Sequence, residues 1–205
     1  MKYLKFYETF IDKVIIGIDI DGTISNFGEA YNTLYKTYFP DKEIHPVDEW
    51  FWYTKMDYDG EKAGDWFNNK KAETFDLAQP YPDAMNTIDN IYKFIKTYGF
   101  TLKIVTNQPN EESKTAAKIW LEKYKFKYDD IIFVDMARDK WKYADIMVDD
   151  APKVIDTKPL SKVAIKIEQL WNTDNQGDIN IPNIKSLTID VMKQAIFKLK
   201  NNTVG

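Results

Sequence analysis

Apolar residues fall into short continuous runs that alternate with longer stretches of helical spacing, and this order predicts an α/β fold. The first run, Val-Ile-Ile-Gly-Ile at residues 14–18, has no alternation of apolar and polar positions. Such runs are typical of strands that are buried on both faces of a parallel sheet. Similar runs predict further strands at residues 100–105, 131–134, 145–148 and 163–167.

Between these runs, apolar residues recur at intervals of three and four, which indicates helices. One helix begins near Asp83, and Gly99 occupies the position of a left-handed cap at its end. Another follows Asn110, whose side chain can cap it. Strands that alternate with helices imply right-handed crossovers, and so a Rossmann-like, doubly wound parallel sheet. The other predicted helices cover residues 27–38, 61–73 and 190–200.

The residues between Thr23 and Pro80 do not follow this alternation. They contain two predicted helices, separated by an irregular segment that is rich in aromatic residues. We interpret residues 24–79 as a small helical cap domain inserted after the first strand. Residues 1–23 and 80–205 are then expected to form the α/β core domain.

Composition narrows the classes of protein that the chain can represent. With 205 residues, 44% of them apolar, the chain is long enough for one sizeable core or a core with an insert. A net charge of −4 without a strong basic run argues against a nucleic-acid polymer as partner. The chain has no cysteine, so it forms neither disulfides nor thiolate metal sites. It also lacks a membrane-length apolar run and a signal-peptide pattern, and we expect a soluble cytoplasmic protein.

Two acidic residues follow the first predicted strand, in the segment Asp19-Ile20-Asp21-Gly22-Thr23. Parallel sheets carry their active sites just beyond the carboxyl ends of the strands, where Asp19 and Asp21 fall. Two neighbouring carboxylates are unfavourable unless a cation neutralises them or one carboxyl group stays protonated. Because an Asp-Gly pair after a strand is also a common turn, this motif alone leaves a purely structural role open.

Polar residues at the ends of two other strands favour a functional site. Thr106 and Asn107 follow the second strand, Lys140 lies shortly before the fourth, and Asp149 and Asp150 end that strand. Each of these features has a structural explanation of its own. Thr106-Asn107 can form a turn at the start of a helix, Lys140 can be a solvated surface lysine, and Asp149-Asp150 can be an N-cap pair. These explanations do not account for their predicted position at one edge of the sheet, where carboxyl ends of parallel strands meet.

These residues, in this order, resemble the four motifs of the haloacid dehalogenase-type phosphohydrolases. The resemblance covers residues 14–156 and implies a phosphatase in which ionised Asp19 attacks phosphorus and forms an aspartyl-phosphate. Asp21 is expected to stay protonated long enough to donate to the leaving oxygen, and later to accept a proton from water.

The resemblance also implies Mg²⁺ as cofactor, since this cation prefers oxygen ligands. Its expected ligands are Asp19, the backbone carbonyl of Asp21, and Asp149 or Asp150, with the choice within the last pair left open. Neutralisation of charge around the phosphoryl group is expected to lower most of the barrier. The predicted phosphate-binding residues are Thr106, Asn107 and Lys140.

A closer resemblance is to the 5′(3′)-deoxyribonucleotidases, which implies a nucleoside monophosphate as substrate and a homodimer as the assembly. The segments Ser25-Asn26-Phe27 and Pro80-Tyr81-Pro82-Asp83-Ala84 match this group around the cap. The segments Arg138-Asp139-Lys140 and Asp149-Asp150-Ala151-Pro152 match it in the core. The chain departs from the group at Ala151, where Arg is frequent, and at Asn107-Gln108-Pro109, where Ser-Pro usually follows the threonine.

Aromatic residues of the cap are candidates for stacking against a nucleotide base, although many of them can instead form the cap's own core. Two other functions remain open: hydrolysis of another small ester such as a sugar phosphate, and a catalytically inactive binding module. The candidate pocket residues are Phe27, Trp50, Trp52 and Trp66.

Overall fold

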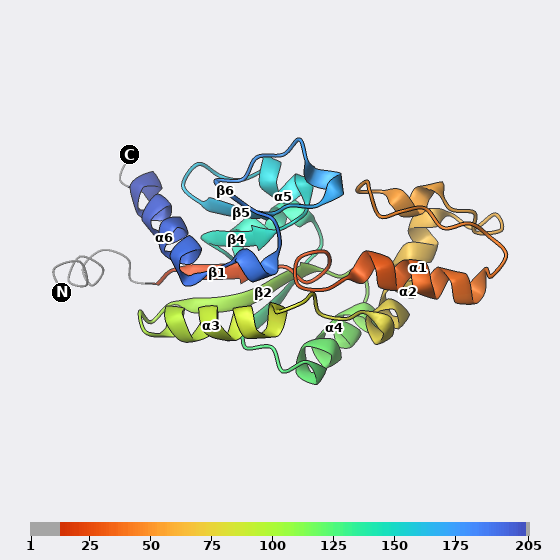
Figure 1. Cartoon of the computed structure of the whole chain (residues 1–205), viewed down its shortest axis with the longest axis horizontal. Helices are drawn as coiled ribbons and strands as arrows, with labels where there is room; N and C mark the ends of the chain where they lie inside the picture. Colours follow the sequence, from red (N-terminus) through yellow and green to blue (C-terminus); the bar gives the residue numbers. More distant parts are fainter. Residues whose placement is uncertain (1–12, 204–205) are drawn as a thin grey trace.

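The computed structural model describes residues 13–203, and its centre is a six-stranded, all-parallel sheet (Figure 1). The strand order is β3-β2-β1-β4-β5-β6, so β1 lies in the middle of the sheet. Ile18 of β1 is in register with Ile104 of β2 and Val148 of β4. The prediction of a Rossmann-like α/β fold is therefore confirmed. The strands are β1 (Ile15–Ile18), β2 (Thr101–Asn107), β3 (Asp130–Val134), β4 (Ile146–Asp149), β5 (Val163–Ile167) and β6 (Ile179–Ile181).

Helices cover both faces of the sheet. Alternate residues of a strand point to opposite sides, and apolar side chains on both sides pack against helices. On one face, Leu102 and Ile104 belong to the main apolar core, which includes residues of α3 (Ala84–Lys96) and α6 (Ile189–Thr203). On the other face, Val105 packs with residues from η3 (Ala137–Lys142) and α5 (Pro152–Asp156). Gly17 also faces this second side, where an added Cβ would lie 2.6 Å from the sulfur of Met147.

Most predicted element boundaries agree with the structure, and the differences are local. Gly99 has φ of +71°, and the Asn110 side chain accepts a 2.8 Å hydrogen bond from the amide of Ser113 at the start of α4 (Glu111–Lys123). The cap helix α2 (Ala63–Leu77) ends four residues later than the predicted 61–73. The short edge strand β6 and the 3-10 helices η4 (Leu170–Asn172) and η5 (Ile184–Ser186) were not predicted.

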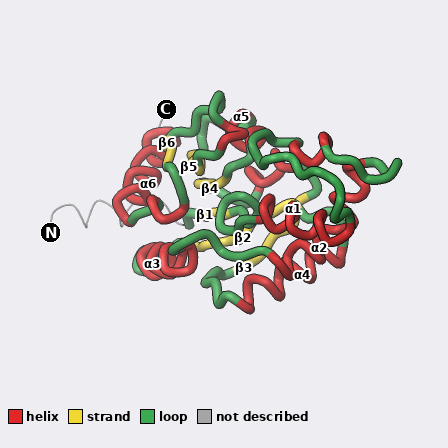
Figure 2. The backbone as a smooth tube through the Cα atoms, turned by 45° about the vertical axis from the view of Figure 1, so that its right-hand side comes forward, coloured by secondary structure: helices red, strands yellow, loops and turns green. Residues whose placement is uncertain are grey.

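The segment between β1 and α3, here called the cap (residues 24–79), contains α1 (Phe27–Tyr38), η2 (Trp52–Lys55) and α2. It lies beyond the carboxyl ends of the strands, with α2 beside both α1 and α4 (Figure 2). The cap has an apolar cluster of its own, separate from both clusters on the sheet: Tyr31, Tyr35, Trp52, Met56, Tyr58 and Trp66.

The two chain segments that join cap and core run side by side. The amide of Asn26 donates to the carbonyl of Gln79 at 3.0 Å, and the amide of Tyr81 donates to the carbonyl of Ile24 at 3.0 Å. These bonds fix the base of the cap above the end of β1. Within residues 13–203, no helix has the length and apolar character needed to cross a membrane.

Candidate active site

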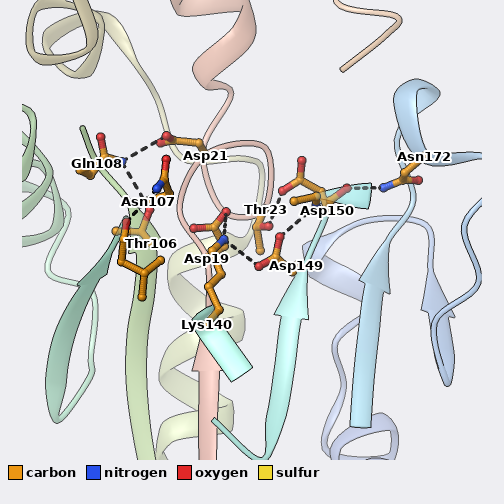
Figure 3. Close-up of polar contacts among 12 residues, drawn as sticks. Asp19, Asp21, Thr23, Thr106, Asn107, Gln108, Lys140, Asp149, Asp150 and Asn172 are labelled. Carbon is orange, nitrogen blue, oxygen red and sulfur yellow. Dashed lines mark hydrogen bonds and ion pairs between the residues drawn. The ribbon is translucent and has the colours of Figure 1, made fainter. Parts of the chain in front are cut away.

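Acidic side chains from β1 and β4 meet at the carboxyl edge of the sheet (Figure 3). Asp19 follows β1 directly, and its amide donates to the carbonyl of Val148 at 3.1 Å, which continues the parallel pairing into the site. Carboxylate oxygens of Asp19, Asp149 and Asp150 lie within 4.8 Å of one another. The structure therefore brings together the acidic residues that the sequence placed at one edge.

Lys140 provides a buried positive charge within this cluster. Its Nζ lies 2.8 Å from Oδ2 of Asp19 and 2.8 Å from Oδ2 of Asp149, and the residue is 2% exposed. Burial alone would lower the pKa of Lys140, but the charges of Asp149 and Asp19 outweigh it and raise the pKa. Lys140 is thus a permanent cation that connects the β1 and β4 carboxylates.

Asp149 and Asp150 are buried and are held by different donors. Oδ1 of Asp149 accepts from the amide of Ala151 at 2.9 Å. Burial, opposed by Lys140 and reinforced by Asp19, raises the pKa of Asp149 to about 7. Burial also raises the pKa of Asp150 well above its ordinary value, and the neighbouring charges of Asp149 and Asp19 add to this effect. Both raised pKa values show that negative charge is unfavourable in this cluster without a further cation.

A tight loop after β1 positions a hydroxyl group against Asp150. The hydroxyl of Thr23 donates to Oδ1 of Asp150 at 2.7 Å. The loop turns at Gly22, whose φ is +76°, and an added Cβ there would lie 2.4 Å from Oδ2 of Asp150. The glycine of the Asp-Gly motif is therefore required both by the backbone conformation and by the close approach of a carboxylate.

Asp21 lies on the cap side of the cluster and contacts two residues that the sequence analysis did not assign to the site. Its Oδ2 accepts from Nζ of Lys71 at 3.1 Å and from Nε2 of Gln108 at 3.2 Å. Burial raises the pKa of Asp21, and the positive charge of Lys71 opposes that effect. The predicted acid is thus placed between the core, which supplies Gln108, and the cap, which supplies Lys71.

A signal for Lys71 is present in the sequence. Phe67, Lys71 and Phe75 are spaced by four residues, so they lie along one side of α2. Phe75 is part of the main core and Lys71 is only 6% exposed. A lysine within a buried apolar stripe is unusual, because an unpaired charge is costly to bury, and it points to a partner across the interface.

The donor atoms of the acidic cluster fit a hard divalent cation. Carboxylate oxygens of Asp19, Asp149 and Asp150 lie within 4.8 Å of one another, close enough to bind one cation together. Three carboxylates face one ammonium group, Lys140, so the cluster has an excess of negative charge. All available ligand atoms are oxygens, as Mg²⁺ prefers. The side chain of Asp21 lies outside this cluster, which leaves its backbone carbonyl as the predicted ligand.

A cavity of about 250 Å³ lies between the cap and this cluster. Thr106, at the end of β2, lines it with Asn107. The side-chain amide of Asn107 is directed away, since it donates to the carbonyl of Val134 at 2.7 Å. A larger groove of about 540 Å³ lies between α2 and α4, but none of the predicted site residues lines it.

Three of the four predicted pocket residues line the cavity: Phe27, Trp50 and Trp52. Trp66 does not, so we do not retain it as a pocket residue. It is buried in the cap's own core, with its ring centroid 5.4 Å from that of Tyr31 and 5.2 Å from that of Tyr58. One residue in a helix corresponds to a rotation of about 100°, which turns Trp66 away from the side on which Phe67 lines the cavity.

A loop after β5 completes the rim of the site. The indole Nε1 of Trp171 donates to Oδ2 of Asp150 at 3.0 Å, and Trp171 lines the cavity. Next to it, Asn172 donates to the carbonyl of Asp150 at 2.8 Å. Buried Lys166 of β5 fixes this loop by donating to the carbonyls of Asn172 and Asn175. The sequence alone did not decide whether this loop reaches the site.

The order of the strands and the position of the cap are shared with solved structures of the haloacid dehalogenase (HAD) superfamily. A putative haloacid dehalogenase-like hydrolase from Bacteroides fragilis has 13% identity over 86% of this chain and 100% of its own, with a TM-score of 0.56. The putative HAD-hydrolase YfnB from Bacillus subtilis, bound to magnesium, has 13% identity over 85% and 96%, with a TM-score of 0.55. At 13% identity, these similarities show only that the chain shares its fold with these proteins.

A match to a protein-family model shows the family to which the chain belongs. The model described as "5′ nucleotidase, deoxy (Pyrimidine), cytosolic type C protein" matches residues 13–180, and the chain belongs to this family. A comparison with curated proteins found no significant match. Fold and family together identify the chain as a phosphohydrolase of the HAD superfamily.

Proposed function

We propose that this protein is an Mg²⁺-dependent phosphatase that hydrolyses nucleoside monophosphates through an aspartyl-phosphate on Asp19. The observation that carries the proposal is the environment of Asp19: Oδ2 is paired with Lys140, and Oδ1 is buried with no hydrogen-bond partner within residues 13–203. Asp19 also lines the cavity between cap and core. A fixed carboxylate with one free oxygen at the base of a cavity is suited to nucleophilic attack.

In the first step, Oδ1 of Asp19 forms a bond to phosphorus as the bond from phosphorus to the ester oxygen breaks. Asp21 donates a proton to that oxygen, so the product leaves as an alcohol. In the second step, water attacks the phosphorus of the aspartyl-phosphate, Asp21 accepts a proton from the water, and the bond to Asp19 breaks to release phosphate. Asp21 suits both roles because burial favours its protonated form.

Charge neutralisation during both steps comes from residues at the base of the cavity. Lys140 offsets negative charge that accumulates beside Asp19. Thr106 and Asn107 line the cavity, which supports the Thr106 hydroxyl and the Asn107 backbone amide as donors to the phosphoryl group. When bound by Asp19, the backbone carbonyl of Asp21 and either Asp149 or Asp150, Mg²⁺ would supply additional positive charge beside the phosphoryl group.

The cap side of the cavity supports a nucleoside as the leaving group. Trp50, Trp52 and Phe27 offer aromatic surface above the phosphate end, and base stacking on such rings contributes about 1–3 kcal/mol per base. The printed description of the family, which names deoxy and pyrimidine, makes pyrimidine deoxyribonucleotides the first substrates to examine.

A substrate panel tests this proposal. Release of phosphate from dUMP, dTMP, UMP and several sugar phosphates would be measured with Mg²⁺ and with EDTA. We expect metal-dependent turnover, with kcat/KM for the preferred nucleotide at least about tenfold above that of any sugar phosphate, a preference worth about 1.4 kcal/mol. Equal rates on sugar phosphates would remove the nucleotide assignment. Absence of metal-dependent turnover on every ester would favour a binding module.

The role of Asp21 is tested separately through the leaving group. Replacement Asp21→Asn removes the proton donor, so hydrolysis of a nucleotide, whose alkoxide is a poor leaving group, should slow severely. Hydrolysis of p-nitrophenyl phosphate, whose phenolate leaves readily, should slow much less. A uniform loss for both esters would contradict the acid role of Asp21.

The proposal also covers the location of the protein in the cell and its oligomeric state. We propose a cytoplasmic protein, which the word "cytosolic" in the family description supports, and a homodimer, which rests on the resemblance to the deoxyribonucleotidases. Light scattering of the purified protein tests the assembly directly. A monomer across the working concentration range would overturn the dimer without affecting the proposed chemistry.

A further inference from the structure

Lys71 reaches the active site from the cap, whereas the other polar residues that contact Asp21 and Asp19 belong to the core. It extends from α2, and its Nζ lies 3.1 Å from Oδ2 of Asp21 and 3.1 Å from the backbone carbonyl of Asn107. A single side chain therefore connects the cap with the loop after β1 and with the end of β2.

The surroundings of the Lys71 ammonium hold it in one place. The rings of Phe27 and Phe67 cover it, with Nζ 5.5 Å and 5.6 Å from their centroids. With the residue 6% exposed, water can compete only weakly for its hydrogen bonds. Two aromatic faces and two oxygen acceptors thus define the position of a charge that is otherwise costly to bury.

The consequence of this contact is seen in the two oxygens of Asp21. Oδ2 receives two donors, Lys71 from the cap and Gln108 from the core. Oδ1 is buried and has no partner among the described residues, and Asp21 lines the cavity. The two donors therefore fix the orientation of the carboxyl group and leave Oδ1 without a donor of its own.

We propose that Lys71 is a positioning residue that acts through Asp21: by holding Oδ2 from the cap, it presents Oδ1 to the leaving oxygen of the substrate. This inference rests on the proposed phosphatase function. It makes proton transfer depend on the position of the cap, because the contact is lost if α2 moves away from the end of β1. An open cap then leaves the nucleophile in place, but the acid keeps only its donor from the core, Gln108.

The experiment compares two esters in three variants. Lys71→Met keeps the length of the side chain and removes its charge, Lys71→Arg keeps the charge, and Lys70→Met alters the adjacent residue. Lys70 is a matched control because it pairs with Glu73 at 2.6 Å on another side of the same helix. For each variant, kcat and KM are measured with the preferred nucleotide and with p-nitrophenyl phosphate.

For Lys71→Met we expect kcat on the nucleotide to fall at least about 30-fold, since general acid catalysis supplies 10²–10⁴-fold. We expect kcat on p-nitrophenyl phosphate to fall less than about threefold, because that leaving group needs little protonation. KM should stay close to wild type for both esters. Lys71→Arg should recover most of the lost rate, and Lys70→Met should match wild type.

Three results would overturn the inference: equal losses on both esters, which indicate a general structural role; a change in KM alone, which indicates substrate binding; or no change. Thermal unfolding of each variant checks that it is folded, and Lys71→Gln replaces Lys71→Met if the latter does not fold. If the wild-type protein hydrolyses neither ester with Mg²⁺, the proposed function fails first. If the wild-type protein hydrolyses the esters but Lys71→Met slows both of them equally, the proposed function stands and only the role of Lys71 fails.

Discussion

The indole nitrogen of Trp171 donates a 3.0 Å hydrogen bond to Oδ2 of Asp150. On the opposite side of the same carboxylate, the hydroxyl of Thr23 donates to Oδ1 at 2.7 Å. Donors from the loops after β5 and β1 therefore set the plane of this carboxylate. Such contacts orient metal ligands, and their loss commonly weakens metal binding about 10–100-fold.

Replacement Trp171→Phe keeps an aromatic ring at the rim but removes the donor to Asp150. We expect the Kd for Mg²⁺ to rise roughly tenfold, at the lower end of the range for such contacts. Calorimetric titration of the substrate-free protein measures this value independently of activity. Trp50→Phe is the control, because Trp50 lines the cavity from the cap and should leave the Kd unchanged. Equal effects of both replacements would contradict the role of Trp171.

Replacement Asp19→Asn removes the attacking charge with little change in volume. We expect kcat to fall at least about 10³-fold, while the fold is retained because Lys140 keeps its pairing with Asp149. Mass spectrometry after acid quenching should find a phosphorylated Asp19 peptide in wild type and none in the variant. If Asp19→Asn retained about a tenth of the wild-type kcat or more, Asp19 would not be the nucleophile.

Replacement Lys140→Met leaves the carboxylates of Asp19 and Asp149 without their buried cation. We expect a loss of about 3 kcal/mol in the free energy of unfolding near pH 8, measured by denaturant titration without metal. The loss should be smaller near pH 5.5, where protonation removes part of the uncompensated charge. Lys142→Met is the control, because Lys142 is exposed and pairs with Asp139, so it should cost less than about 0.5 kcal/mol. Equal losses in the two variants would show that the buried pairs do not stabilise the fold.

The stability of the metal-free protein and the stabilisation by Mg²⁺ should depend on pH in opposite senses. The pKa of Asp149 is raised to about 7, and that of Asp150 is raised as well, so the folded state binds protons more tightly than the unfolded state. This contribution to stability is present below the unfolded pKa of about 4 and is lost as pH rises through about 7. In EDTA, we expect the contribution of these groups to lower Tm between pH 5.5 and pH 8.

Mg²⁺ competes with these protons, so it should raise Tm more at pH 8 than at pH 5.5. Differential scanning calorimetry at both pH values, with Mg²⁺ and with EDTA, provides the measurement. Asp19→Asn serves as a comparison, since loss of one carboxylate should reduce the effect of Mg²⁺ at pH 8. A larger rise of Tm at pH 5.5 would mean that the acidic cluster does not hold the metal.

The central part of the fold and site could be predicted because buried parallel strands leave a clear pattern. Continuous apolar runs locate β1, β2, β4 and β5, and polar residues at their ends then fall at one edge of the sheet. Asp19 and Asp149 are found in this way, since each directly follows or ends such a run. Short β6, with three residues and one of them exposed, carries too little apolar pattern to be recognised.

Contacts between distant segments could not be predicted in the same way. The spacing of Phe67, Lys71 and Phe75 distinguishes Lys71 from its neighbour, but only the position of the cap shows that its partner is Asp21. Trp66 and Phe67 are neighbours of similar character, yet helix rotation places one in the cap core and the other at the cavity. Which side of α2 contacts the core and which faces solvent depends on how the helix packs, and the sequence of the helix alone does not specify its partners.

The paired segments at the base of the cap bear on how this protein can change over evolution. Since the amide of Asn26 and the carbonyl of Gln79 are 3.0 Å apart, the insertion enters and leaves at a single point of the scaffold. An insertion attached in this way can be lengthened or exchanged without disturbing the catalytic framework beneath it. Under the proposed function, recognition of the organic moiety can therefore diversify while phosphate chemistry stays constant, and a replacement module would have to supply the contact that Lys71 makes with Asp21.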